Sequence, residues 1–524
     1  MLRSTLVAAS PCRFACTMPV SMLLAWLAAV PLGAQLTLTG NYRVFQSDAG
    51  GLVEAGDSFG QTLAAGDWNG DGWDDLAVGT PGEDVGVISN AGGVVILFGS
   101  ALGVGKGPLA DQGFHQDSPG VEDLAEAGDQ FGGALAPGDW NGDHYADLAV
   151  GVPFEDLDGV SNAGAVHIFV GSAAGLVPAP ANSIVSGMSF GVGVYALERD
   201  GRFGAALVAC DRNGDGRDEL VIGIPSSIVD PPTRSGAIIE LPGYASGVTP
   251  SGAVYRDSPD DALEDLFGFS LACGNLDQTG AGDLLVGAPR APVGGDPGAA
   301  RNGAVWRIAS SGTIESHASA AGGSGLRGYS VAAGDFEGEG YDQAIWGLPG
   351  RGSQGVYMSG GANWDGPPAL AQGANGYADA AELWDMFGQV ISTGDFNRDG
   401  NADVAFGVPE EDLFDGTDDE VIEAGLVQVV QSNNNGPLGA DQLFHWGAEI
   451  GFAPLFEDLF GAALAAGDFN KDGIDDLAVG APGAEWNGAA KTGIVQIFHG
   501  SKPNWIFGDG FETGTHWKWS STVP

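Results

Sequence analysis

Seven short acidic segments carry residue types and spacings that suit a hard metal cation. The clearest segment begins at Asp67 and reads DWNGDGWDD. Its first, third, fifth and ninth positions bear side-chain oxygens, from Asp67, Asn69, Asp71 and Asp75. Alternate residues converge on one point when a chain curls, and Gly72 at the sixth position permits the sharp turn. Because calcium takes about six to eight oxygen ligands, this spacing predicts a calcium-binding loop.

Five of the seven segments keep an oxygen-bearing side chain at all four positions. Besides the first, their predicted ligand sets are Asp139, Asn141, Asp143 and Asp147; Asp211, Asn213, Asp215 and Glu219; Asp395, Asn397, Asp399 and Asp403; and Asp468, Asn470, Asp472 and Asp476. The fourth segment offers only two carboxylates, in the set Asn275, Asp277, Thr279 and Asp283. The fifth segment offers bulkier side chains and no ninth-position carboxylate, in the set Asp335, Glu337, Glu339 and Gln343. We therefore expect about five to six calcium ions, with a weak fourth site.

Other interpretations of these segments stay open. Asp and Asn close ordinary Asx turns without a metal, although several like charges packed into one turn without a cation are costly. An EF-hand needs a glutamate at the twelfth position and flanking helices, whereas strand residues such as Val78 and Val150 stand there. Magnesium is disfavoured because it retains bound water. In the second segment His144 replaces the glycine, which predicts a strained turn.

The acidic segments belong to a repeat whose other local signals all favour β-strands. Its seven copies start 72, 72, 64, 60, 60 and 73 residues apart. In the first copy we expect four strands, at 61–65, 76–78, 94–98 and 113–115, with a Gly-x-Pro stop after the second. Because units of four strands, repeated about four to eight times, form β-propellers, the sequence predicts an all-β protein with a seven-bladed β-propeller of four-stranded antiparallel blades.

The ends of the repeat array predict how the ring closes. The seventh copy lacks a clear fourth strand after Phe498, whereas a spare strand, YRVFQ at 42–46, precedes the first copy. If the spare strand completes the last blade, no sheet edge stays open. The alternative is a linear array of separate hairpins, which would bury little apolar surface.

Phe-Gly, the acidic loop and Gly-x-Pro occur together in six copies, as at Phe59-Gly60 and Phe131-Gly132. The fifth copy departs from this pattern, with Arg327-Gly328-Tyr329 where Phe-Gly belongs. On these motifs residues 35–501 resemble the FG-GAP repeats of the integrin α-subunit β-propeller. The resemblance implies the same fold and the same calcium assignment. An inserted adhesion domain, leg domains and a cytoplasmic tail are not found, so we do not expect a full integrin subunit.

The composition narrows the class of partner. The chain carries 68 acidic and 20 basic residues, a formal net charge of -48, and 44% hydrophobic residues. A chain this apolar can bury a core, which favours a globular protein over a disordered one. Because its negative field repels phosphate backbones, we expect no nucleic-acid partner and little attraction to an anionic membrane.

The two ends of the chain predict export. Arg3 and Arg13 precede an apolar run at 18–32 and the small pair Gly33-Ala34, which is the layout of a secretory signal peptide. We predict a signal peptide at 1–34, the propeller at 35–501 and a C-terminal tail at 502–524. The protein is then secreted or displayed at a bacterial cell surface, without a stable membrane span after cleavage. The alternative is an uncleaved membrane anchor.

Cysteine usage does not indicate a disulfide framework. Cys12 and Cys16 fall in the predicted leader, which leaves Cys210 and Cys273 in the mature chain. These two lie in neighbouring repeats but one position out of phase, and strand alternation would point them to opposite faces. We therefore expect two buried thiols.

Long connections between the second and third strands, at 82–91, 154–163, 410–424 and 483–492, should gather at the face opposite the acidic loops. Loops on a rigid scaffold usually carry binding, and in integrins the corresponding face engages partners. We therefore expect a monomeric, extracellular binding or adhesion-type module whose ligand is a protein or a glycan. Solvated insertions without any ligand are the alternative.

No enzyme is expected from these residues. None of the seven histidines has metal-ligand spacing to another, and GMSFG at 187–191 matches G-x-S-x-G without the helix that this motif needs. Two alternatives stay open. One is a propeller enzyme that acts on an extracellular substrate such as polysaccharide, and the other is a purely structural surface protein.

Overall fold

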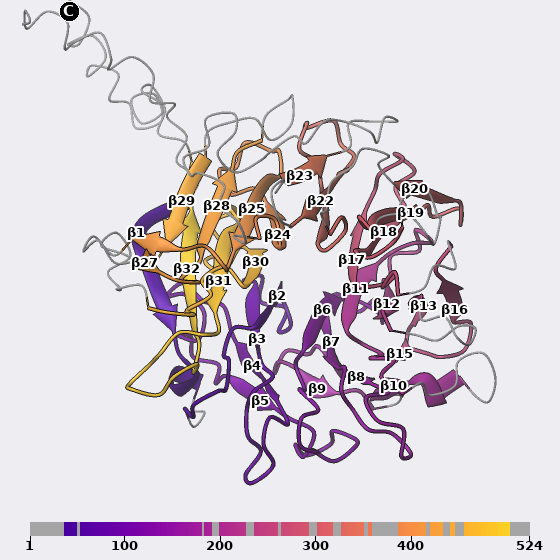
Figure 1. Cartoon of the computed structure of the whole chain (residues 1–524), viewed down its shortest axis with the longest axis horizontal. Helices are drawn as coiled ribbons and strands as arrows, with labels where there is room; N and C mark the ends of the chain where they lie inside the picture. Colours follow the sequence, from indigo (N-terminus) through magenta and orange to yellow (C-terminus); the bar gives the residue numbers. More distant parts are fainter. Residues whose placement is uncertain are drawn as a thin grey trace, which may run out of the picture. The chain divides into compact units, whose positions relative to one another are not determined.

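A computed structural model describes residues 36–49, 53–180, 183–190, 199–226, 235–259, 264–292, 301–317, 326–349, 355–358, 386–414, 420–432, 441–445 and 455–502. These residues all fall within one compact unit, Ala34–Lys502 (Figure 1). Its described elements are β-strands and two short 3-10 helices, η2 (Gln46–Ala49) and η3 (Gly187–Phe190). In this part of the chain no helix has the length and apolar character needed to cross a membrane.

Each repeat forms its own antiparallel sheet, and its strands follow in chain order from the inside outward, except that an N-terminal strand completes the last sheet. Repeats one to three form β2 (Thr62–Gly66), β3 (Asp75–Thr80), β4 (Gly93–Leu97) and β5 (Gln112–Phe114); β6 (Ala134–Gly138), β7 (Asp147–Val152), β8 (Ala165–Val170) and β10 (Ile184–Ser186), with β9 (Val177–Pro178) also on β8; and β11 (Ala206–Cys210), β12 (Glu219–Ile224), β13 (Ala237–Leu241) and β16 (Val254–Asp257). Repeats four to six form β17 (Ser270–Gly274), β18 (Asp283–Ala288), β19 (Ala304–Ile308) and β20 (Ile314–His317); β21 (Val331–Gly334), β22 (Gln343–Leu348) and β23 (Gly355–Met358); and β24 (Val390–Gly394), β25 (Asp403–Val408), β28 (Leu426–Val430) and β29 (Asp441–His445). Repeat seven forms β30 (Ala463–Gly467), β31 (Asp476–Ala481) and β32 (Ile494–Gly500), and two small hairpins pair β14 (Gly243–Tyr244) with β15 (Gly247–Val248) and β26 (Leu413–Phe414) with β27 (Glu420–Val421).

The inner strands pack against one another around a central space (Figure 1). Each inner strand contacts the inner strand of the next repeat, and β30 of repeat seven returns to β2 of repeat one. A cavity of about 460 Å³ lies at the centre and is lined by the inner strand of every repeat. The all-β propeller built from four-stranded antiparallel blades is confirmed.

The predicted number of complete blades is wrong. Six sheets have four strands or more, whereas repeat five has three described strands, β21, β22 and β23. The residues that follow β23, at 359–385, lie outside the described part of the chain. Six four-stranded blades are therefore present in the described residues, where seven were expected.

The spare N-terminal strand closes the ring as predicted. The strand β1 (Leu36–Val44) pairs antiparallel with β32, with Tyr42 opposite Ile497 and Val44 opposite Val495. It becomes the outer strand of repeat seven, in the sheet order β1-β32-β31-β30. Residues more than 400 positions apart thus complete one blade.

The Phe-Gly motif joins neighbouring blades through the backbone. Phe131 is fully buried and forms a parallel bridge with Gly92, which precedes the third strand of repeat one. A Cβ on Gly92 would lie 2.4 Å from both the backbone nitrogen and the backbone oxygen of Phe131. Only glycine fits there. In repeat five, Arg327 makes the equivalent bridge to Gly303, so the departure in sequence preserves the contact.

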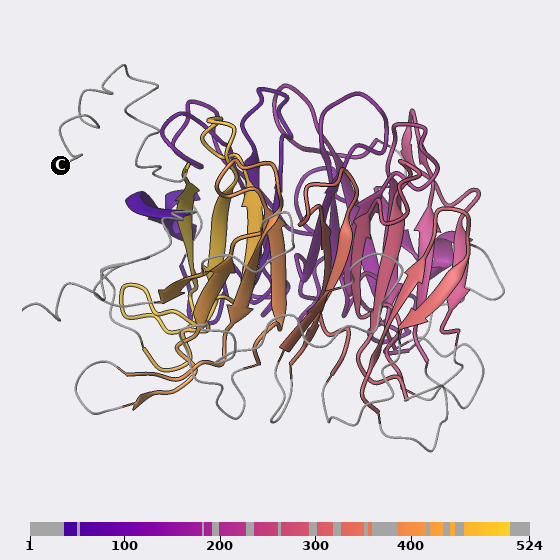
Figure 2. The same ribbon diagram turned by 90° about the horizontal axis from the view of Figure 1, so that it is seen from above.

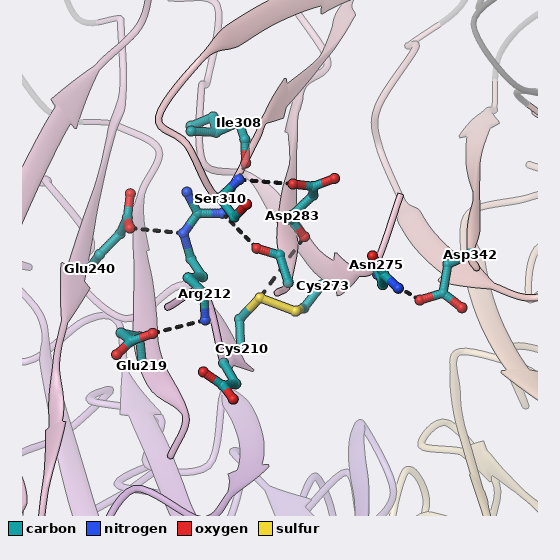
Figure 3. Close-up of a disulfide and its surroundings, with 12 residues drawn as sticks. Cys210, Arg212, Glu219, Glu240, Cys273, Asn275, Asp283, Ile308, Ser310 and Asp342 are labelled. Carbon is teal, nitrogen blue, oxygen red and sulfur yellow. Dashed lines mark hydrogen bonds and ion pairs between the residues drawn. A yellow bond between two sulfur atoms is a disulfide. The ribbon is translucent and has the colours of Figure 1, made fainter. Parts of the chain in front are cut away.

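The two mature-chain cysteines form a disulfide, contrary to our expectation (Figure 3). Cys210 ends β11 and Cys273 is the next-to-last residue of β17, and their Cα atoms lie 5.6 Å apart. Neighbouring inner strands pack with an offset of one residue. A Cβ on Gly138, at the end of β6, would lie 2.5 Å from the Cβ of Ala209, the next-to-last residue of β11. Two residues that differ by one position in the repeat therefore meet between neighbouring inner strands. The alternation of side chains within one sheet does not apply, because β11 and β17 belong to different sheets.

Reduction of this disulfide should destabilise the fold. The bond closes a loop with a sequence separation of 63 residues. Its loss should lower the free energy of unfolding by about 4 kcal/mol, because the unfolded chain regains loop entropy. Urea unfolding with and without reductant measures this change. The double variant Cys210→Gly/Cys273→Ala, which carries residues found at these positions in other repeats, should not respond to reductant. Full alkylation of both cysteines in the folded, unreduced protein would contradict the pairing.

Candidate metal-binding loops

The acidic loops connect the first and second strands of each sheet. In repeat one, β2 ends at Gly66 and β3 begins at Asp75, which lie opposite each other in the ladder. The ninth loop position is thus the first residue of a central strand in every repeat. Because the same two strands are joined each time, the loops emerge at the same end of the sheets. This placement agrees with the strands predicted at 61–65 and 76–78, which flank the first acidic loop.

Backbone donors inside each loop curl it around its first residue. The carboxylate of Asp67 accepts the N–H groups of Gly70, Asp71 and Gly72 at 2.7, 3.1 and 2.9 Å. Corresponding bonds converge on Asp139, Asp211, Asp395 and Asp468. These contacts form an Asx-type turn, so the curl by itself fits both the metal-binding and the metal-free interpretation. In repeat two, His144 adopts a positive φ of 72°, as the missing glycine predicts.

The ninth-position carboxylates are buried at the base of the loops. Asp75, Asp147 and Asp403 are fully buried, and each accepts hydrogen bonds from backbone N–H groups. Burial, together with the charges of the other loop acids, outweighs the backbone hydrogen bonds and raises the pKa of Asp75 to about 8, of Asp147 to about 7 and of Asp403 to about 8. In the described residues none of the three forms an ion pair with lysine or arginine. A bound cation or a bound proton would neutralise each of these buried carboxylates.

The structure brings some predicted ligands together and leaves others apart. The third and ninth positions touch in four loops, for example Asn397 Nδ2 to Asp403 Oδ2 at 3.1 Å and Asn213 Nδ2 to Glu219 Oε1 at 2.7 Å. In the described loops, the three carboxylates do not bring their oxygens as close together as the third and ninth side chains are. Among described residues, one group of three acids has ligand atoms all within 4.8 Å, and it lies outside these loops. An ion would have to draw the first and fifth positions inward.

An arginine takes the place of a cation in the fourth loop. Arg307 Nη2 lies 3.1 Å from Asp277 Oδ2 and 2.7 Å from Asp283 Oδ2. It projects from β19, at a register position that holds isoleucine in repeats one, two and seven. The guanidinium neutralises both carboxylates of this loop. The set Asn275, Asp277, Thr279 and Asp283 therefore stays a prediction of a weak calcium site, at which an ion would compete with this guanidinium.

Two other loops also have internal partners. In repeat five the Gln343 amide oxygen accepts the N–H of Phe336 at 2.8 Å, so a neutral group fills the role of the ninth carboxylate. In repeat seven His499 Nδ1 lies 3.0 Å from Asp476 Oδ2 and 3.1 Å from Asn470 Nδ2. Its hydrogen bond to Asp476 raises the pKa of His499. His499 was not predicted, because it comes from the distant strand β32.

Sequence reasoning also missed the eighth loop position. There an aspartate accepts the backbone N–H of the first loop residue in the preceding repeat. The backbone N–H of Asp139 donates to Asp218 Oδ2 at 2.9 Å. The backbone N–H of Asn275 donates to Asp342 Oδ2 at 2.7 Å (Figure 3). Asp395 donates to Asp475 and Asp468 donates to Asp74, both at 2.8 Å. The signal is an acid at the eighth position of repeats one, three, five and seven.

Comparison with known proteins supports the repeat assignment. The FG-GAP repeat family matches residues 59–97, 131–169, 387–422 and 460–498, which fall in repeats one, two, six and seven. This chain carries FG-GAP repeats. Integrin alpha-IIb of Mus musculus is 28% identical over 273 residues, covering 47% of this chain and 24% of that protein. Integrin alpha-V of Gallus gallus is 34% identical over 184 residues, covering 33% of this chain and 15% of that protein. The FG-GAP chain is thus homologous to integrin α subunits over part of its length.

An enzyme also shares this similarity. Phosphatidylinositol-glycan-specific phospholipase D of Bos taurus is 32% identical over 166 residues, covering 32% of the FG-GAP chain and 18% of that protein. The matched region spans less than a fifth of that relative's length. The expectation that this chain is not an enzyme is therefore wrong as an inference from the sequence, because part of the chain is similar to an enzyme.

Solved structures resemble the FG-GAP chain only distantly. The exotype rhamnogalacturonan lyase YesX aligns with a TM-score of 0.39 and 12% identity, over 84% of this chain and 72% of that one. A streptogramin B lyase aligns with a TM-score of 0.42 and 9% identity, over 87% of this chain and 96% of that one. At these values neither alignment bears on function.

Replacing Arg307 tests its role as an internal cation. Arg307→Ile should lower the free energy of unfolding by about 3–5 kcal/mol in EGTA, because the buried Asp283 loses its partner. Added calcium should recover part of this loss. Denaturant unfolding in EGTA and in calcium measures both effects. As a control, Lys491→Ala breaks the exposed pair with Glu457 and should change stability by less than about 1 kcal/mol. An Arg307→Ile protein as stable as wild type would contradict the assignment.

Proposed function

We propose that this chain is an exported, calcium-binding propeller that serves as an extracellular binding or adhesion-type module. The observation that carries the proposal is the row of buried ninth-position carboxylates, represented by Asp75, Asp147 and Asp403, which lack a basic partner in the described residues. The homology to integrin α subunits supports the module's role.

Five loops would hold the ions, those of repeats one, two, three, six and seven. Their donors are carboxylate and amide oxygens, which suit a hard cation such as calcium. A bound ion would offset the charge of buried carboxylates at the junction between the loops and the central strands. In this proposal calcium stabilises the blades, and the ligand binds elsewhere.

The proposed ligand surface is the opposite end of the sheets, where the connections between second and third strands emerge (Figure 2). Its described hairpins, such as that at Val85 and Ile88, extend well beyond the strands, and Val87 is 99% exposed. An extracellular protein or glycan is the proposed partner, bound by a monomer. We also propose that the three-stranded sheet acts as a seventh blade, since β21 contacts β17 and β24.

The proposal includes export of the protein. A leader at 1–34 and a tail at 502–524 fall outside the described residues, and we propose their roles from the sequence alone. The basic, apolar and small-residue order of the leader supports secretion or display at a bacterial cell surface.

A second candidate is an enzyme that uses the propeller in an extracellular reaction, on a polysaccharide or a glycan-linked lipid. The similarity to a phosphatidylinositol-glycan-specific phospholipase D favours it. In that case the loops opposite the acidic ones would contribute acidic groups.

Calcium removal should destabilise the fold. EGTA should lower the melting temperature. A free calcium concentration of about 100 times the Kd of one site stabilises the folded protein by about 2.7 kcal/mol, and EGTA removes this contribution. Asp71→Ala should remove one ion from the calcium count and leave the others. Glu339→Ala, at the same loop position of repeat five, should leave the count unchanged. Melting curves that coincide in EGTA and calcium would rule the proposal out.

Binding and turnover distinguish the two candidate functions. The purified protein should capture a glycan or a matrix protein on an array without converting it. A parallel screen with polysaccharides and a phosphatidylinositol-glycan substrate measures turnover. Product formation would favour the enzyme, and neither capture nor turnover would leave a structural role for the propeller.

A further inference from the structure

A histidine lies in the apolar core between the sheets of repeats one and two. His167 belongs to β8 and is opposite Val150 of β7 and Ile184 of β10. The centroid of its ring is 5.3 Å from that of the Phe131 ring. Phe131 in turn forms the backbone bridge to Gly92 of repeat one. His167 is therefore placed at the contact that joins two neighbouring blades.

The imidazole of His167 has no hydrogen-bond partner within the described part of the chain. The residue is 1% exposed, and its Nδ1 and Nε2 are both buried without a partner. A polar group buried in this way costs free energy, whereas an aliphatic side chain would not. Repeats one and three carry Val95 and Ile239 at the same ladder position, opposite Val78 and Ile222. Apolar packing alone therefore does not call for a histidine here.

Among the described residues, no titratable group faces the imidazole from the elements packed against it. The side chains on this face of the interface are apolar, and they are Val94 and Ile96 of β4, Phe114 of β5, Phe131, Val150 of β7 and Ile184 of β10. The acids on the flanking segments are Asp129, Asp147 and Glu155. Burial is the one cause that lowers the pKa of His167, to about 3, so none of these acids offsets it.

We propose that the contact between repeats one and two is an acid-sensitive joint, which opens when His167 takes up a proton. An imidazolium without a partner is costly in an apolar core, so protonation favours a form in which the two sheets separate and water reaches the ring. The equivalent joints between repeats seven and one and between repeats two and three hold Val95 and Ile239 instead. These two joints carry no proton-binding group at this position, so acid should open the first joint selectively.

The direction of the pH effect follows from where the proton binds more tightly. A histidine exposed to water has a pKa of about 6.5, whereas burial lowers the pKa of His167 to about 3 in the closed joint. Between these values the open form binds more protons than the closed form. The joint is therefore most stable above pH 6.5 and weakens as the pH falls toward 3. Between pH 7.5 and pH 4.5, the opening equilibrium constant should rise about 100-fold because of this one group.

Hydrogen exchange followed by mass spectrometry tests the joint in the full-length protein, in calcium-free buffer at pH 7.5 and 4.5. After correction for intrinsic amide rates, β8 of wild type should exchange faster at pH 4.5, by up to about 100-fold. His167→Val, which carries the residue of repeat one, should not show this increase. The strand β28 of repeat six is the internal reference and should not show it either. An equal increase in His167→Val, or an equal increase in β28, would overturn the proposal.

Urea unfolding at the same two pH values provides a second readout. Acids elsewhere in the chain also titrate in this range, so the quantity compared is the ratio of the unfolding equilibrium constants of wild type and His167→Val. This ratio should rise about 100-fold from pH 7.5 to 4.5. His445→Gln, which removes an exposed histidine at the end of β29, should follow wild type. A ratio that is the same at both pH values would overturn the proposal, and His167→Ile, with the residue of repeat three, replaces His167→Val if that variant does not fold.

Discussion

The contact on which the ring depends is the backbone bridge between the Phe of one repeat and the Gly before the third strand of the preceding repeat. Phe59 bridges to Gly493, and Phe131 bridges to Gly92. The first of these joins the two ends of the array. Because the bridge uses main-chain atoms and a glycine without a Cβ, it sets the distance between blades and leaves the side chain of the first residue to fill the core. Arg327 shows this division, since it keeps the bridge although the aromatic ring is absent.

The inner strands then meet with an offset of one residue, and small side chains make this possible. Gly138 faces Ala209, and Gly274 faces Ala333. Where the pair is Cys210 and Cys273, the same offset produces a covalent bond. Periodicity along one strand predicted the sheets, the closure by β1 and the place of the acidic loops. It could not predict the disulfide, because the alternation rule applies within a sheet and this pair lies between sheets.

The candidate site was predictable to the extent that it is local. The curl of each loop follows from bonds between residues at most five positions apart, so Asp67 and its counterparts were found from spacing alone. What decides whether a loop needs a metal comes from elsewhere in the chain. Arg307 and His499 reach their loops from the third strand of the sheet, about 24 residues beyond the ninth position. The eighth-position aspartates act on the preceding repeat. No one-dimensional pattern separates Arg307 and His499 from ordinary strand residues, whereas the eighth-position aspartates recur in alternate repeats.

The loops differ in where the positive charge that balances their carboxylates comes from. A loop of the Asp67 type is already curled by its own hydrogen bonds, so a cation there offsets charge and changes the fold little. In the fourth loop the positive charge comes from within the chain, because Arg307 Nη2 lies 3.1 Å from Asp277 Oδ2 and 2.7 Å from Asp283 Oδ2. Because Arg307 belongs to β19, folding itself brings this charge to the loop, and its effect does not depend on ion concentration as that of a bound ion does. The backbone bridges from Phe59 to Gly493 and from Phe131 to Gly92 use no side-chain charge, so they close the ring whichever way a loop is neutralised.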